Sequence, residues 1–288
     1  MMSAGKQNNL DQFLNDVRLV MAESLSQTVL QKLVEEKKSL LNSGKMLRSR
    51  LCYRVGLPAG VPYKTLLHAG AAVEMIHSAS LLHDDVIDGG HIRRGAPTFW
   101  VKRGIPGAIL VGDLMLFKAL DVVGQVEEGR LTRQLIKVTG EVCDAESEQE
   151  LLLRGSSPEW SDCIKIARRK TGALFAFSAY ACGNNDPTLS ETLLESGYQI
   201  GTAYQLADDI LDATGSREDS DKSLGSDEHR NKPTAAKFNP AEAIACVHDL
   251  SGQALEALRP WPAVYKAWSE FMETDIKPVL NSFTASAT

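Results

Sequence analysis

Apolar residues recur every three or four positions along most of the chain, which is the period of an amphipathic α-helix. Between about residues 9 and 41, Leu10, Phe13 and Val17 follow this spacing, and the Asn-Ser-Gly run at 42–44 ends it. The same pattern predicts further helices at about residues 46–55, 62–89, 104–123, 127–153, 158–183, 189–214, 239–258 and 261–281. No segment keeps a two-residue alternation, so the sequence predicts an all-α fold with almost no strand.

Two of these helices, 62–89 and 189–214, have little charge and many small residues, such as Ala69, Gly70 and Ala79. A helix that is apolar on most sides lies in the middle of a bundle, so we expect these two helices to be central and to face each other. No linker is long enough to divide the chain, which predicts a single domain over residues 1–288. The polar, charged segment 215–231 is predicted to be a loop.

Composition excludes some classes of function. The net charge of −6 argues against binding to a nucleic-acid backbone. The five cysteines form no CxxC pair, which is typical of small buried residues in a reducing compartment. The sequence shows no apolar signal core and no stretch of membrane-spanning length, so we expect a cytoplasmic protein without a transmembrane segment.

An aspartate motif occurs twice, each time at the end of a predicted central helix. The motifs are DDVID, with Asp84, Asp85 and Asp88, and DDILD, with Asp208, Asp209 and Asp212. Within each motif the i and i+4 carboxylates share one helix face, repel one another, and favour a hard cation. Oxygen-only ligands suit Mg²⁺, which also binds substrate phosphates. A single such motif is more often a solvated surface, but here small and apolar residues precede both copies.

Basic residues lie before, between and after the two aspartate motifs along the chain. Lys45 and Arg48 lie near a helix N-terminus, which suits an anion, and Arg93-Arg94 lie in a glycine-containing loop that suits bidentate phosphate binding. Lys170-Thr171 lie in an apolar helix, where a lysine needs an anion or must reach the surface. Lys222 and Lys232 flank the polar loop. Each of these residues alone is more often simply solvated.

Taken together, the chain resembles the trans-isoprenyl diphosphate synthases, the polyprenyl synthetase family. The resemblance rests on the ordered set GKMLR (44–48), EMIHSASLLHDDVID (74–88), RRGAPT (93–98), VGD (111–113), KTG (170–172) and YQLADDILD (204–212). It implies an isoprenoid synthase fold: a bundle of about ten or more helices around a central active-site cavity. It also implies a homodimer, three Mg²⁺ ions, and isopentenyl diphosphate and an allylic diphosphate as substrates.

The resemblance also implies roles for individual residues. The metal ligands are Asp84, Asp85, Asp88 and Asp208, with Asp209 and Asp212 completing the second motif. The allylic diphosphate is bound by Arg93, Lys170 and Lys232, assisted by Lys222, and isopentenyl diphosphate by Lys45, Arg48, His77 and Arg94. Thr171 and Gln205 lie near the reacting carbons. The allylic C1–O bond then ionises, the isopentenyl double bond attacks C1, a proton is lost, and no protein nucleophile is needed.

Product length is predicted from the residues before the first motif. Ala79 and Ser80 are small, whereas a bulky aromatic there would stop growth at about the C15 stage in this family. Deeper residues that could line the path are Met75, Ile76 and Ala72, with Phe117 and Leu120 on a facing helix. We therefore expect a product longer than C15, roughly C20 to C40. The alternatives are a short-chain farnesyl or geranylgeranyl diphosphate synthase, or small residues that serve only close helix packing.

Two departures and three rival assignments accompany the resemblance. Ser49 stands where the family usually has proline, and the C-terminus PVLNSFTASAT lacks the basic tail of many relatives. A class I terpene cyclase would normally have a different second motif and lack Lys45 and Arg48. A non-catalytic subunit of a heteromeric synthase would typically have lost the aspartate motifs. A di-iron bundle, suggested by Glu74-x-x-His77, requires a second ExxH motif that the sequence lacks.

Overall fold

The structure is a computed structural model that describes residues 4–41, 44–126, 129–156, 159–214, 238 and 240–278. The α-helices are α1 (Ala4–Ser26), α2 (Val34–Leu41), α3 (Leu47–Gly56), α4 (Tyr63–Ile87), α5 (Phe99–Gly124), α6 (Arg130–Glu148), α7 (Trp160–Ala167), α8 (Ala173–Tyr180), α9 (Pro187–Thr214), α11 (Pro240–Glu256) and α12 (Pro262–Phe271). The strands within the described residues are the two-residue β1 (Ile92–Arg93) and β2 (Ala96–Pro97). The all-α prediction is therefore confirmed.

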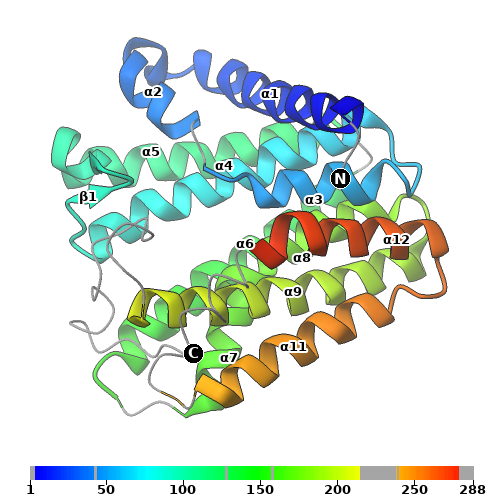
Figure 1. The fold of residues 1–288 in the computed structure, drawn as a ribbon. Helices are drawn as coiled ribbons and strands as arrows, with labels where there is room; N and C mark the ends of the chain where they lie inside the picture. The colour runs from blue at the N-terminus through cyan, green and yellow to red at the C-terminus, as the bar shows by residue number, and fades with distance from the viewer. Residues whose placement is uncertain are drawn as a thin grey trace.

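Helices α4 and α9 run through the length of the bundle (Figure 1). Helices α1, α3, α5 and α8 pack around α4, while α7, α8 and α11 pack against α9. Helix α4 is buried along most of its length, and α9 buries residues such as Leu193, Ile200 and Ile210. Both helices are thus central, as their lack of charge predicted. None of the described helices is long and apolar enough to cross a membrane.

Helix α9 approaches the segment before α8 very closely, and glycine makes this possible. A Cβ atom on Gly201 would lie 2.7 Å from the Cα atom of Gly172, which is closer than real Cβ contacts. Any larger residue at Gly201 must push the two backbones apart. The close approach brings the segment around Lys170 and Thr171 against the second aspartate helix.

Within the described residues, three π-helical turns interrupt the regular helices, at Gln149–Leu153, Arg168–Gly172 and Met272–Ile276. Such turns shift the helix register by one residue and occur often at functional sites. The first two turns lie beside each other: Lys170 Nζ of the second turn donates a hydrogen bond to Gln149 Oε1 of the first over 3.3 Å. The predicted helices 127–153 and 158–183 therefore exist, but each contains a π-turn that its sequence pattern does not reveal.

The prediction of one continuous helix over residues 9–41 was wrong, because the first helix ends at Ser26. Thr28 has an extended backbone, its hydroxyl donates to the Leu25 carbonyl over 2.7 Å, and its oxygen accepts from the Leu30 N–H. These side-chain hydrogen bonds replace those of a continuing helix. A short 3₁₀ turn, Val29–Lys32, then leads into α2.

Candidate active site

Both aspartate motifs lie at the C-terminal ends of the central helices, as predicted. Asp84 and Asp85 are buried in the last turn of α4, and Asp88 follows as its C-terminal cap. Asp208 and Asp209 are half-buried in α9. The backbone of Asp212 continues α9, but its side chain lies outside the described atoms.

The π-turn Arg168–Gly172 connects the two motifs. The Lys170 ammonium interacts electrostatically with Asp84 and Asp88 of the first motif. On the next residue, the Thr171 hydroxyl donates to Gln205 Oε1, and Gln205 Nε2 donates to Asp209 Oδ1 over 2.6 Å. One turn thus acts on α4 through the charge of Lys170 and reaches α9 through hydrogen bonds.

Lys170 is held among carboxylates. Burial alone would lower the pKa of its ammonium, but Asp84, Glu146 and Asp88 more than offset burial and raise that pKa. Glu146 of α6 also forms an ion pair with Lys170. Lys170 is therefore a permanently charged cation at the edge of the first motif, where a diphosphate would be attracted.

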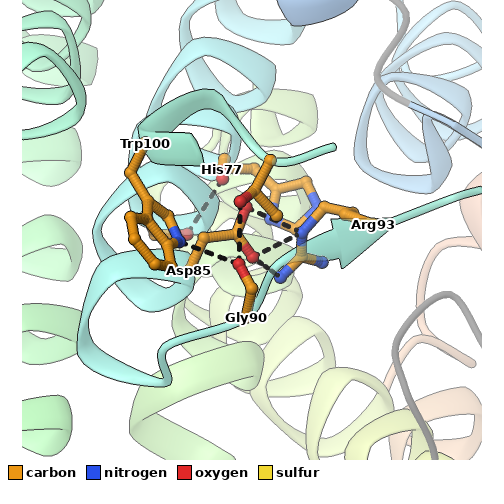
Figure 2. A network of polar contacts seen from close by, with 7 residues as sticks. His77, Asp85, Gly90, Arg93 and Trp100 are labelled. Carbon is orange, nitrogen blue, oxygen red and sulfur yellow. Dashed lines mark hydrogen bonds and ion pairs between the residues drawn. The ribbon is translucent and has the colours of Figure 1, made fainter. Parts of the chain in front are cut away.

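A small hairpin after the first motif positions the two arginines. Arg93 in β1 binds Asp85 in a fork, with Nε 2.9 Å and Nη2 2.8 Å from Oδ1. The Gly90 carbonyl accepts from the Trp100 indole over 2.8 Å, which fixes the start of the hairpin (Figure 2). Asp85, predicted as a metal ligand, thus also orients Arg93, and its metal role stays a prediction.

Arg94 packs on the loop before α3. A Cβ atom on Gly44 would lie 2.6 Å from Arg94 Nη2, so a larger residue there would require the end of this guanidinium to shift. Both residues have positive φ angles, 67° for Gly44 and 51° for Arg94. Lys45, the residue after Gly44, is exposed.

Cations surround His77. Burial, and then the charges of Arg48, Arg94 and Arg93, hold the pKa of His77 well below its usual value, so the imidazole is neutral. The guanidinium of Arg48 lies over the ring of Phe175, with Cζ 5.1 Å from the ring centroid. Several positive charges around a neutral imidazole form a site suited to an anion. The predicted isopentenyl diphosphate residues Arg48, His77 and Arg94 are therefore brought together.

The residues predicted to limit product length occupy two environments. Met75, Ile76 and Ala79 are buried in α4, while Ser80 is half-buried and its hydroxyl donates to the His77 carbonyl over 2.9 Å. The prediction that Phe117 lines the product path from a facing helix was wrong, because its side chain is 72% exposed on the outside of α5. Leu120, the other residue expected there, is half-buried and packs against the core.

The carboxylate oxygens of both motifs fit a hard divalent cation. The positive charge of the Lys170 ammonium partly balances the negative charges of Asp84 and Asp88. The described residues contain no group of three His, Cys, Asp or Glu residues arranged to hold an ion by themselves. Lys222, Lys232, the loop 215–231 and the C-terminal run 279–288 lie outside the described residues.

Sequence reasoning missed several residues at this site. Glu146 and Gln149 contact Lys170, but the run DAESEQE around them resembles a solvated surface. Phe175 was treated only as part of an apolar helix. Glu74 was weighed as an iron ligand, whereas the structure shows it accepting hydrogen bonds from Ser49.

Comparison with known proteins agrees with this geometry. The model of the polyprenyl synthetase family matches residues 29–245. The short chain isoprenyl diphosphate synthase of Methanocaldococcus jannaschii is 31% identical over 229 residues, which cover 72% of this chain and 69% of that protein. Heptaprenyl diphosphate synthase component 2 of Bacillus subtilis is 34% identical over 223 residues, covering 75% of this chain and 64% of that protein.

A solved structure shares the fold. The polyprenyl synthase from Caulobacter crescentus, crystallised with calcium and isoprenyl diphosphate, has a TM-score of 0.80 to this chain. The two are 23% identical, and the match covers 92% of this chain and 94% of that one. The bundle is thus an isoprenoid synthase fold. The family match and the two relatives show that the chain belongs to the polyprenyl synthetase family and is an enzyme of the prenyltransferase class.

Proposed function

We propose that the protein condenses isopentenyl diphosphate with an allylic diphosphate and releases diphosphate. The observation on which this rests is the π-turn at Lys170 and Thr171, which interacts with the first aspartate motif through the charge of Lys170 and with the second through hydrogen bonds. A diphosphate seated there meets Lys170 on one side and carboxylates that can bind metal on two others. The cation-rich site around His77 provides a second anion position without a carboxylate motif of its own.

Each group of residues then has a task. Asp84, Asp85, Asp88 and the second motif would hold Mg²⁺, which would supply positive charge that stabilises the diphosphate leaving C1. Arg93 and Lys170 bind the departing diphosphate, while the oxygens of Thr171 and Gln205 stabilise the developing carbocation. Lys45, Arg48, His77 and Arg94 hold the isopentenyl double bond in line with C1. Three ions, and assistance from Lys222 and Lys232, remain part of the proposal.

The reaction is tested by incubating the purified chain with labelled isopentenyl diphosphate, a series of allylic primers and Mg²⁺. Diphosphate release and chain elongation by this chain alone support the proposal. The Bacillus subtilis relative is named as component 2, so elongation that requires a second protein would instead indicate one subunit of a heteromeric synthase. Diphosphate release without consumption of isopentenyl diphosphate would indicate a cyclase. Both results would contradict the proposal.

We further propose a product longer than C15. The small side chain of Ala79 is fully buried in α4, five residues before Asp84, so a growing chain that runs along α4 would meet little bulk there. Ala79→Tyr should shorten the product while the first condensation persists, and Ala72→Tyr, two turns deeper, should shorten it less. Because both changes overpack a core, the thermal stability of each variant is measured as well. Unchanged product lengths in folded variants would refute this path.

We also propose that the protein is a homodimer, that its chain forms a single domain, and that it is cytoplasmic. Leu110 and Phe117 form an outward row on α5 and are 67% and 72% exposed, which supports a homodimer through this face. One hydrophobic cluster includes residues from Leu10 to Ile276, which supports a single domain. We propose a cytoplasmic location, which cell fractionation with an antibody to the chain would test.

A further inference from the structure

A buried hydrogen-bond network joins the first turn of α3 to the middle of α4. Ser49 and Glu74 are both fully buried. The Ser49 backbone N–H donates to Glu74 Oε1 over 3.2 Å, and the Ser49 hydroxyl lies 3.2 Å from the same oxygen and 3.3 Å from the Gly70 carbonyl oxygen. The network therefore connects the two helices that hold Arg48 and His77.

The start of α3 explains why this N–H is free to donate. The first backbone hydrogen bond of α3 runs from the Arg50 N–H to the Met46 carbonyl over 2.9 Å. The N–H of Ser49, one residue earlier, thus has no acceptor within its own helix. Glu74 supplies that acceptor from α4, and the positive end of the helix favours its negative charge.

Ser49 is also what orients the Glu74 carboxylate. The second oxygen of Glu74, Oε2, is buried and has no hydrogen-bond partner among the described residues. Within the described residues, the carboxylate accepts its hydrogen bonds at Oε1, and both come from Ser49. Ser49 therefore supplies the hydrogen bonds that orient the buried Glu74 carboxylate within the described residues.

Glu74 in turn faces the cations of the proposed isopentenyl diphosphate site. Its charge acts on Arg48 and favours the ionised guanidinium, against the effect of burial. Arg48, Arg94 and Arg93 all act on His77, one turn after Glu74. Guanidinium groups so close together repel one another before any anion arrives, and a buried carboxylate beside Arg48 reduces that repulsion.

We propose that Ser49 is a positioning residue for isopentenyl diphosphate. Through Glu74 it keeps Arg48 over Phe175 and near His77, where the diphosphate binds. The inference rests on the function proposed above. It depends on this particular residue, because a proline at position 49 has neither an N–H nor a hydroxyl to donate.

The test is calorimetric titration of the full chain with isopentenyl diphosphate alone, which is not consumed without an allylic partner. Ser49→Ala, which removes the hydroxyl, should weaken binding about threefold, and Ser49→Pro, which removes both donors, about tenfold. Proline is tolerated in a first helical turn, so the second variant can fold. In steady-state assays the KM for the allylic diphosphate should change less than about twofold, because Arg93 and Lys170 are untouched.

A double-mutant cycle distinguishes positioning from general packing. Glu74→Gln should weaken isopentenyl diphosphate binding in the same direction, and Ser49→Ala should then add little, because the residue through which it acts has lost its charge. Ser190→Ala is the matched control. It removes an equally buried hydroxyl, bonded to the Asp186 carbonyl over 2.8 Å, and should leave binding unchanged.

Several results would overturn the inference. They are unchanged or tighter isopentenyl diphosphate binding in Ser49→Ala, an equal rise in KM for both substrates, and a full Ser49→Ala effect in the Glu74→Gln background. If Ser49→Pro fails to fold, Ser49→Ala and Glu74→Gln still decide the question. Failure of the proposed function would look different: the parent chain would release no diphosphate with any primer, whatever the titrations show.

Discussion

Single contacts at the site separate the two proposed diphosphate positions. Arg93 is bound to Asp85 in a fork, while Arg94 packs on Gly44 near Lys45, although the two arginines are adjacent in sequence. Arg93→Ala should therefore raise the KM for the allylic diphosphate about tenfold, and Arg94→Ala should raise the KM for isopentenyl diphosphate instead. Asp85→Asn should follow Arg93→Ala, because it loosens the fork. Equal effects of both arginines on both substrates would contradict this division.

The neutral His77 makes stability depend on pH. Its pKa is held well below the usual 6.5 in the folded protein, first by burial and then by Arg48, Arg94 and Arg93. Below about pH 6.5 the unfolded chain therefore binds a proton that the folded chain does not, so stability falls as pH falls. His77→Gln removes this proton uptake. Its melting temperature should fall less than that of the parent between about pH 7.5 and 5.5.

The control for this measurement is His248→Gln, which changes an exposed histidine on α11 and should keep the slope of the parent. Differential scanning calorimetry across the pH range gives all three slopes. A His77→Gln slope as steep as that of the parent would show that the imidazole is not the group responsible.

At the residue scale, the sequence predicted charged side chains better than their partners. Asp84, Arg48 and Lys170 were all identified, because each belongs to a spaced motif. Glu146, which pairs with Lys170, was not identified, because it lies in a charged run that resembles a solvated surface. The direction of the Asp85 fork was also hidden, since it depends on the hairpin that follows α4.

At the scale of elements, close packing of α9 on the π-turn is what joins the Thr171 hydroxyl to Gln205. Gly201→Ala should push these backbones apart, lower the melting temperature by at least about 2 °C and reduce kcat more strongly than a comparable loss of stability elsewhere. Gly140→Ala is the matched control. This glycine lies in α6 with open space around it, so alanine should stabilise the protein by about 0.5–1 kcal/mol. Equal behaviour of the two variants would contradict the packing argument.

Helix periodicity located most elements but not their interruptions. The predicted helix 62–89 corresponds to α4, and 189–214 to α9, because long apolar patterns dominate there. The break after Ser26 depends on hydrogen bonds of one threonine hydroxyl. The long helix predicted from residue 104 is preceded by a helical turn from Phe99, with a non-helical Gly104 between them. Such features follow from local hydrogen bonds and tertiary contacts, which an apolar period does not contain.

At the scale of the whole molecule, residues near both ends of the described chain belong to one hydrophobic core, and ion pairs join the C-terminal end to α3. Asp275, in the last π-turn, forms ion pairs with Arg50 and Arg54 of α3. These contacts place the C-terminal helices beside the segment that holds Arg48. The family's fold was predictable because its motifs are ordered along the sequence, whereas this long-range ion-pair cluster has no motif of its own.

The outer face of α5 leads to the last prediction. Leu110 and Phe117 are seven residues apart, which places them on the same side of the helix, and both are largely exposed. Apolar side chains gathered on one face favour association. If this face joins two copies, Phe117→Glu combined with Leu110→Glu should halve the particle mass measured by light scattering, since two buried charges oppose the contact. Leu19→Glu, on α1 and 59% exposed, should leave the mass unchanged. A parent that is monomeric at micromolar concentration, or a double variant that stays dimeric, would contradict an interface at this face.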